Sequence, residues 1–202
     1  PPTRKASAAG TASIVFVGDV MLDNGPGHAI ASGRDPFAAC AGLLLDADFT
    51  VGNLECVLGR GGKLAHKAYV FRAAEDSPRH LRRYFSAVSL GNNHAFDFGP
   101  DGLVAMLDIL DREGIRRFGA GRTLAEARRP LVLEKDGLRI AILAANGFRG
   151  AEYAATDATP GVAPLREADL LADIAAARTT ADAVIPFVHW GDELVAPVHE
   201  GD

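Results

Sequence analysis

The chain has 202 residues, of which 48% are hydrophobic and 23% are charged, the balance of a globular protein that can bury a substantial core. Its formal net charge of -5 argues against a sequence-independent nucleic-acid binder, which usually presents a basic face, so we expect no nucleic-acid partner. Its two cysteines, Cys40 and Cys56, match no CxxC pattern and are expected to be small, partly buried side chains.

The first dozen residues are rich in Pro, Ala, Ser and Gly and are expected to form a flexible leader (1–12) before a single domain (13–202). No apolar run approaches the ~20 residues needed to span a bilayer. β-branched and apolar runs predict strands at 13–18, 48–53, 87–90, 131–134, 138–144 and 183–188, with a less regular extended stretch at 67–72.

Helical spacing, capping residues and terminal Gly or Pro predict helices at 36–45, 77–85, 100–113, 123–129 and 167–178. Asp35 is expected to cap the first of these, with Pro36 at its first position. Lys135-Asp136-Gly137 predicts a hairpin turn, and Pro186 indicates an edge position or a bulge in the last strand. The Ala/Thr/Pro/Gly-rich stretch 149–164 is expected to be a mobile surface loop over a site.

Strands that alternate with helices predict a layered α/β domain with a largely parallel sheet. In such folds, ligands gather at the carboxyl ends of the strands. The residues with metal-binding side chains follow this rule, because they fall just after four predicted strands: Asp19, Glu55, Asn93 with His94, and His189.

Carboxylates and imidazoles together suit Zn, Mn or Fe, and a carboxylate can bridge two such ions. Each residue also has a structural alternative. Asp19 fits a simple turn, Glu55 a solvated strand end, His94 a loop histidine satisfied by Asp97, and His189 an imidazole at the edge of the core. The coincidence of all of them at strand ends favours a metal site.

Four segments carry a resemblance to a known family: GDVML (18–22), GNLE (52–55), GNNHAFDFG (91–99) and HWGDE (189–193). In order and rough spacing they resemble the signature runs of the poly-γ-glutamate capsule-synthesis proteins of the CapA type, which are related to the calcineurin-like metallophosphoesterases. The resemblance implies a layered α/β sandwich of the metallophosphoesterase type, with mixed, mostly parallel sheets flanked by helices.

Carried over position by position, the resemblance implies metal ligation by Asp19, Glu55, Asn93 and His189. His94 would stand where phosphoesterases keep an acid for the leaving group. Asp97 would bind the His94 ring and fix its tautomer.

Two departures from the phosphoesterase pattern bear on this site. The position two residues after Asp19, usually His, is Met21, so one bound ion instead of two is an open alternative. The family also continues past the HWG segment into a Gly-His-His-Pro-His-like segment, so the domain is expected to be incomplete at its C-terminal end. His199 is not expected to replace that segment.

The expected function is a metal-dependent hydrolase associated with poly-γ-glutamate capsule synthesis, acting on a phosphoester or an amide-linked acidic polymer. The alternative is a non-catalytic component that binds polyglutamate within a membrane-bound synthesis or export complex, and a third possibility is an inactive domain that keeps only the fold. The resemblance implies association with a membrane, with the domain outside the cytoplasm and this chain itself soluble.

Overall fold

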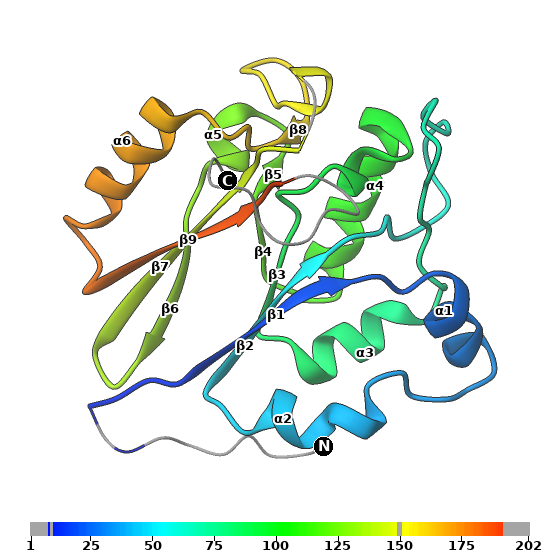
Figure 1. Ribbon diagram of the computed structural model, residues 1–202, viewed down its shortest axis with the longest axis horizontal. Coiled ribbons are helices and arrows are strands. Elements are labelled where there is room, and N and C mark those ends of the chain that lie inside the picture. Colours follow the sequence, from blue (N-terminus) through cyan, green and yellow to red (C-terminus); the bar gives the residue numbers. More distant parts are fainter. Residues whose placement is uncertain (1–7, 9, 149–150, 192–202) are drawn as a thin grey trace.

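Two β-sheets face each other at the centre of the protein, with helices on their outer sides, in a computed structural model that describes residues 8, 10–148 and 151–191 (Figure 1). The first sheet is parallel, in the order β1 (Ile14–Val20), β2 (Phe49–Leu54), β3 (Ala87–Ser89) and β4 (Arg117–Phe118). In the second sheet, β7 (Leu138–Asn146) lies between β6 (Leu131–Lys135) and β9 (Ala183–His189). It pairs antiparallel with β6 and parallel with β9. A short antiparallel ladder joins β5 (Ala120–Gly121) to β8 (Gly161–Val162).

The helices and turns of 3₁₀ helix are α1 (Asn24–Ala31), η1 (Ala38–Cys40), α2 (Ala41–Leu45), α3 (Ser77–Tyr84), η2 (His94–Phe96), α4 (Gly99–Arg112), α5 (Leu124–Ala127), η3 (Ala151–Tyr153) and α6 (Glu167–Ala177). In Figure 1, α1 to α4 lie on the side of the first sheet, and α6 lies beside β7 and β9 of the second. The predicted layered α/β sandwich, with mostly parallel strands flanked by helices, is therefore confirmed. No helix among the described residues is both long and apolar enough to cross a membrane.

Adjacent residues of one strand serve two different cores, because successive side chains of a strand point to opposite faces. Ala87 packs in the cluster between the two sheets, with Phe118 of β4 and Ile142 of β7. Its neighbour Val88 packs on the other side of the sheet against the helices, in a cluster that includes Leu107 of α4. This double burial explains why the predicted strands read as continuous apolar runs without a polar face.

The β6–β7 hairpin and the edge position of the last strand are confirmed. Asp136 and Gly137 both have positive φ, at 50° and 84°, the backbone of a two-residue turn between paired Lys135 and Leu138. Within the described residues β9 pairs on one side only, with β7, so Pro186 removes no hydrogen bond that a second neighbour needs.

The predicted helix 36–45 is wrong as a single element. The segment forms η1 followed by the short α2, because Asp35 closes a tight turn by accepting from the Phe37 amide instead of opening a regular helix. Conversely, α1 was not expected, because Gly25-Pro26-Gly27 looks like a turn. Asp23 caps α1 by accepting from the Asn24 amide.

Two predicted irregular stretches also differ from expectation. The segment 67–72 is not a strand and makes one isolated bridge, Val57 to Arg72. Within the expected loop 149–164, residues 149–150 lie outside the described residues, and the rest contains η3 and β8, with Ala155 and Val162 buried. The stretch is therefore built partly into the fold by pairing with β5. Of the predicted leader 1–12, residues 1–7 and 9 lie outside the described residues.

Candidate metal centre

The carboxyl ends of the first sheet place three polar residues in a row. Asp19 is paired with Asn53 in the β1–β2 ladder, and Asn53 is paired with Ser89 in the β2–β3 ladder. The β1 register shifts between Phe16 and Asp19, an irregularity of the kind that re-aims a side chain beside a functional site. Asn53 Nδ2 donates to Asp19 Oδ1 at 2.8 Å and so fixes this carboxylate at the end of the sheet.

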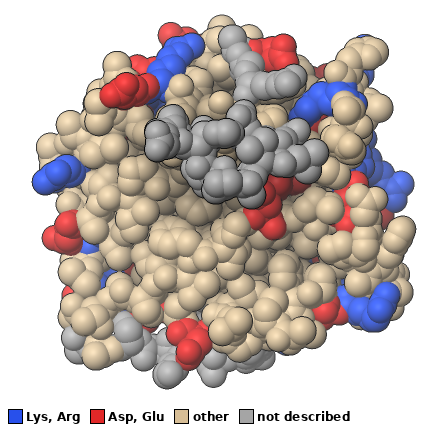
Figure 2. Space-filling view, in the orientation of Figure 1, with Lys and Arg blue, Asp and Glu red and all other residues tan. Residues whose placement is uncertain are grey.

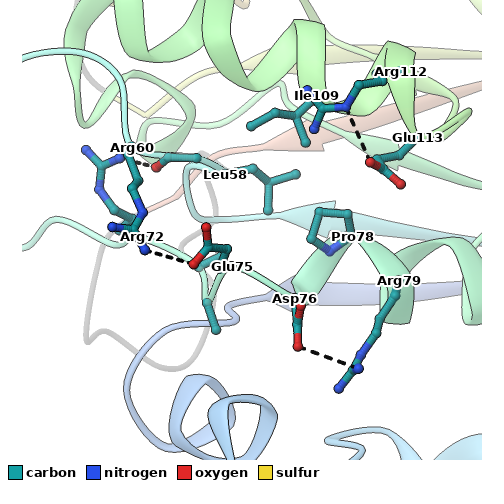
Figure 3. A pocket seen from close by; sticks show the side chains of 13 residues that line it. Leu58, Arg60, Arg72, Glu75, Asp76, Pro78, Arg79, Ile109, Arg112 and Glu113 are labelled. Atoms are coloured by element: carbon teal, nitrogen blue, oxygen red, sulfur yellow. Dashed lines mark hydrogen bonds and ion pairs between the residues drawn. The ribbon is translucent and has the colours of Figure 1, made fainter. Parts of the chain in front are cut away.

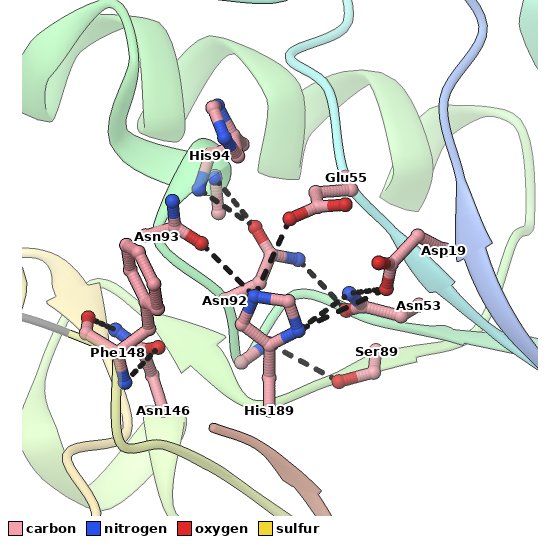
Figure 4. A network of polar contacts seen from close by, with 12 residues as sticks. Asp19, Asn53, Glu55, Ser89, Asn92, Asn93, His94, Asn146, Phe148 and His189 are labelled. Atoms are coloured by element: carbon pink, nitrogen blue, oxygen red, sulfur yellow. Dashed lines mark hydrogen bonds and ion pairs between the residues drawn. The ribbon is translucent and has the colours of Figure 1, made fainter. Parts of the chain in front are cut away.

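His189 comes from the second sheet, at the carboxyl end of β9, and its imidazole lies among the residues expected as metal ligands (Figure 4). Its Nε2 lies 3.0 Å from Asn93 Oδ1 and 3.3 Å from Glu55 Oε1. Its Nδ1 lies 3.8 Å from Asp19 Oδ1. The four expected ligands therefore come together, from four segments far apart in the sequence.

The group of side chains around His189 has the character of a divalent-cation site. One ligand atom from each of Asp19, Glu55 and His189 lies within 4.8 Å of the others. They line a cleft of about 290 Å³ whose described lining contains no Lys or Arg to neutralise the two carboxylates. Carboxylate, amide oxygen and imidazole are ligands that Mn, Zn and Fe accept, so the residues present fit such an ion.

His94 lies in the same cleft and is held by Asp97. His94 Nδ1 is 2.7 Å from Asp97 Oδ2, the contact expected from the sequence. Asp97 has no exposed side-chain surface and also accepts from Lys67 Nζ at 2.5 Å and from the Phe71 amide at 2.8 Å. The Phe71 ring packs on the imidazole with centroids 4.5 Å apart, so the His94 ring is fixed by a hydrogen bond and by packing.

Sequence reasoning missed Asn53 and Asn92, two buried amides that build the site. Asn92 Nδ2 donates to Asn53 Oδ1 at 2.8 Å and to the Leu54 carbonyl at 3.0 Å, while its Oδ1 accepts from the amides of His94 and Ala95. Both residues stand inside the quoted segments GNLE and GNNH. The signal available was an amide side chain close to two of the expected ligands, Asn53 two residues before Glu55 and Asn92 directly before Asn93, at strand ends where few polar groups are expected to be buried.

Lys67 was also missed as a site residue. Besides its bond to Asp97, the Lys67 ammonium donates to the Asn93 carbonyl at 2.9 Å. It also lies 5.1 Å from the centroid of the Tyr153 ring. Lys67 therefore ties the segment after β2 to the loop that carries Asn93 and His94.

Two sulfur-containing residues near the ligands have structural contacts. Met21 Sδ accepts from the Asp23 amide at 3.2 Å and does not line the cleft. Cys56 is fully buried next to Glu55, and burial raises the pKa of its thiol to about 12, so it stays protonated and is unsuited to ligation. Asp192 and Glu193 of the HWGDE segment lie outside the described residues, as does His199.

A larger hollow, of about 670 Å³, lies elsewhere, between the segment after β2 and the end of α4 (Figure 3). Its charged groups are already matched, with Arg60 on Glu75 at 2.8 Å and Arg79 on Asp76 at 3.5 Å. Arg72 donates to the carbonyls of Gly59 and Gly61, and its guanidinium stacks on the Phe98 ring. The paired charges make this hollow a weaker candidate than the His189 cleft, where the described lining offers two carboxylates and no Lys or Arg.

The face that is drawn in Figure 2 carries its Lys, Arg, Asp and Glu side chains mostly around the margin, with a broad uncharged area over the strands. Among the described side chains on this face, therefore, the basic ones are spread along the margin.

Comparison with known proteins assigns the family. Residues 13–200 match the family model described as bacterial capsule synthesis protein PGA_cap, and the chain belongs to this family. It is 29% identical over 187 residues to a protein from Bacillus subtilis named PGA biosynthesis protein CapA, a match that covers 90% of this chain and 49% of that protein.

Two further relatives agree with this assignment. The capsule biosynthesis protein CapA of Bacillus anthracis is 26% identical over 195 residues, covering 90% of this chain and 47% of that protein. A probable polyglutamine synthesis accessory protein of Mycobacterium tuberculosis is 29% identical over 168 residues, a match that covers 77% of this chain and 44% of that protein. The chain thus spans less than half the length of these relatives.

A solved structure described as a novel phosphatase from Mycoplasma pneumoniae has a TM-score of 0.46 and 17% identity, covering 87% of this chain and 54% of that one. At this level the likeness adds nothing to the family assignment.

Proposed function

We propose that this chain carries the divalent-metal site of a hydrolase that acts on a phosphoester or an amide-linked acidic polymer during capsule or polyglutamate synthesis. The observation that carries the proposal is the convergence of Glu55, Asn93 and Asp19 on the imidazole of His189. The printed names of the relatives, which concern PGA biosynthesis and polyglutamine synthesis, support the biological setting.

Asp19, Glu55, Asn93 and His189 would hold one or more ions of Mn, Zn or Fe. When bound, such an ion supplies Lewis-acid polarisation of the scissile group and lowers the pKa of water towards ~7. Asn53 would keep the Asp19 carboxylate in place, because its amide already donates to that oxygen.

His94 would supply the proton that the leaving group needs. Its Nδ1 is engaged by Asp97, so Nε2 is the nitrogen left to face a substrate. Lys67 binds Oδ1 of Asp97, and the Phe71 amide donates to Oδ2, the oxygen that His94 contacts; both fix the carboxylate that orients the imidazole.

The test measures metal and turnover separately. Purified protein, refolded or reconstituted with Mn²⁺, Zn²⁺ or Fe²⁺, is analysed for bound metal and assayed on a generic phosphodiester and on polyglutamate. We expect His189→Ala to lose the metal, and His94→Ala to keep it while turnover falls about 100-fold or more, the range of general acid catalysis. His28→Ala, an exposed histidine on α1, is the matched control. Absence of bound metal together with unchanged turnover in His94→Ala would overturn the proposal.

A second candidate is polymer binding without turnover, as a component of a membrane-bound synthesis or export complex outside the cytoplasm. Met21 favours it, because this position supplies a ligand in the phosphoesterases, whereas here the thioether binds a backbone amide. Metal-dependent binding of polyglutamate that is lost in Asp19→Asn, with no hydrolysis, would support this candidate. Failure to bind polyglutamate at low salt would reject it.

A further inference from the structure

The cleft around His189 is unusually rich in aromatic side chains. Aromatic residues make up 7% of the chain, yet four of the ten residues that line this cleft are aromatic: Tyr69, Phe71, Phe148 and Trp190. They come from the segment after β2, which also carries Glu55, and from the ends of β7 and β9, the latter next to His189.

Two of these rings have a partner within the protein. Phe71 packs on His94. Phe148 lies near His189, with ring centroids 6.3 Å apart (Figure 4). Both rings are partly buried and hold imidazoles that the site needs.

The other two rings are open to solvent. Tyr69 is 68% exposed and Trp190 is 56% exposed. The third exposed aromatic residue, Phe16, stacks on Phe187 across the two sheets with centroids 5.8 Å apart. Single exposed apolar side chains are common and need no explanation. Two exposed rings at the same polar cleft are different, because binding sites combine aromatic walls with a few polar groups.

We propose that Tyr69 and Trp190 form a stacking rim that selects ligands with a flat-faced ring next to an anionic group, which a metal ion at the Asp19–Glu55–His189 site would hold. The inference rests on the proposed function and narrows its substrate class to phosphate esters of a ring-bearing alcohol, either an aryl or a pyranose group. A linear acidic polymer offers no such face. Exposed Trp and Tyr rings supply large contact areas at little entropic cost, which is why they dominate recognition surfaces.

Trp190 is the only tryptophan in the chain, so its fluorescence reports on this cleft alone. The first titration uses Mn²⁺ by itself and monitors quenching of Trp190, which tests the metal site without any ester. The second uses metal-loaded protein with phenyl phosphate, glucose 6-phosphate and the straight-chain control butyl phosphate, and records each dissociation constant by fluorescence and calorimetry.

We expect at least one ring ester to bind about tenfold more tightly than butyl phosphate, the low end of what one stacked ring contributes. Whichever ester binds more tightly, phenyl phosphate or glucose 6-phosphate, identifies the kind of ring that the rim selects. Calorimetry on Tyr69→Ala and Trp190→Ala should show the ring preference reduced several-fold, whereas Tyr69→Phe keeps it. Leu64→Ala, another exposed apolar residue of the same segment that does not line the cleft, is the matched control and should keep it too.

Equal affinity for ring and straight-chain esters, or an unchanged preference in both alanine variants, overturns the inference while leaving the metal site intact. Absence of any ester binding also overturns it. The Mn²⁺ titration then shows whether the proposed function fails with it, because the ion would be held by Asp19, Glu55 and His189 and its binding needs no ligand ring stacked on the rim.

Discussion

Asp97 is the residue on which the geometry around His94 depends. Its carboxylate is fully buried and accepts from an ammonium, an imidazole and a backbone amide, so its charge and its oxygens are satisfied from three directions. A buried carboxylate without a partner is costly, because the protein interior solvates charge poorly. Lys67 is the cation that balances it, from a segment that otherwise has little regular structure.

Replacing Lys67 with Met should therefore destabilise the fold strongly. The change leaves the Asp97 carboxylate buried without its cation, and removing one member of such a pair typically costs about 3–5 kcal/mol. Urea unfolding at pH 7 measures the loss, and Lys67→Arg should recover part of it. Lys63→Met, an exposed lysine of the same segment, is the control and should stay within about 0.5 kcal/mol of the parent protein. Equal stability of the two Met variants would contradict this role for Lys67.

At the scale of elements, the turn before η1 is fastened to α3 through Asp35. Its Oδ2 accepts from the Tyr84 hydroxyl at 2.6 Å and from Arg83 at 3.1 Å, and its Oδ1 lies 3.4 Å from His80 Nδ1. Burial alone would raise the pKa of Asp35, but the hydrogen bonds from Tyr84 and Phe37, with the charges of His80 and Arg83, outweigh it and lower this pKa below its ordinary value. The negative charge of Asp35 therefore stabilises the folded state.

The sign of this effect fixes a pH dependence. Because the folded pKa of Asp35 lies below the unfolded value, its contribution is fully present above the unfolded pKa and is lost as the pH falls through the folded one. We expect Asp35→Asn to unfold about 1–2 kcal/mol more easily at pH 6–7, the value of a few charge-assisted hydrogen bonds. The difference from the parent protein should shrink below about pH 4. A difference that stays constant in urea unfolding from pH 7 down to pH 3.5 would contradict this assignment.

The β6–β7 turn gives a second prediction at this scale. Gly137 has a φ of 84°, which a residue with a Cβ adopts only under strain, so Gly137→Ala should destabilise the fold by about 1 kcal/mol. Gly42→Ala is an informative counterpart, because Gly42 lies in α2 with open space where a Cβ would stand. This change should stabilise the fold by up to about 1 kcal/mol. Thermal unfolding of the two variants should therefore shift in opposite directions.

Elements with strong local signals were predictable from the sequence, and those decided by neighbours were not. α4 has apolar residues at helical spacing and ends before Gly114, and Asp136-Gly137 is a residue pair that favours a two-residue turn. Both elements could therefore be predicted from their local sequence alone. By contrast, the tight turn at Asp35 depends on Tyr84, which lies 49 residues away. α1 begins among glycines and a proline, where a local pattern favours a turn.

At the scale of the whole molecule, the site exists because the two sheets bring their carboxyl ends together. Asp19 and Asn53 end strands of one sheet, and His189, paired with Asn146, ends a strand of the other. The sequence predicted the strand ends and hence the residues that converge on His189, since each of them stands within three residues of the end of a predicted strand. It did not predict Asn92 or Lys67, because their roles depend on partners 39 and 30 residues away.

This arrangement links metal binding to global stability. An ion held by groups from both sheets binds the folded chain and not the unfolded one, so it should stabilise the fold by about 2.7 kcal/mol at a free concentration 100 times its dissociation constant. For a chain of this length that corresponds to a rise in melting temperature of about 5–10 °C. Thermal unfolding with Mn²⁺ or Zn²⁺, and again after excess EDTA, measures the rise and its reversal.

Two variants distinguish a metal site shared by the two sheets from binding of the ion elsewhere on the protein. Glu55→Gln and His189→Ala come from different sheets, and each should remove most of the metal-dependent rise, while the exposed His28→Ala should keep it. In the absence of metal, Glu55→Gln should melt at or above the temperature of the parent protein, because it removes one of two carboxylates that face each other across the His189 imidazole. A rise that survives in both variants would mean that the ion binds elsewhere, and the convergence of the two sheets on His189 would then serve the fold alone.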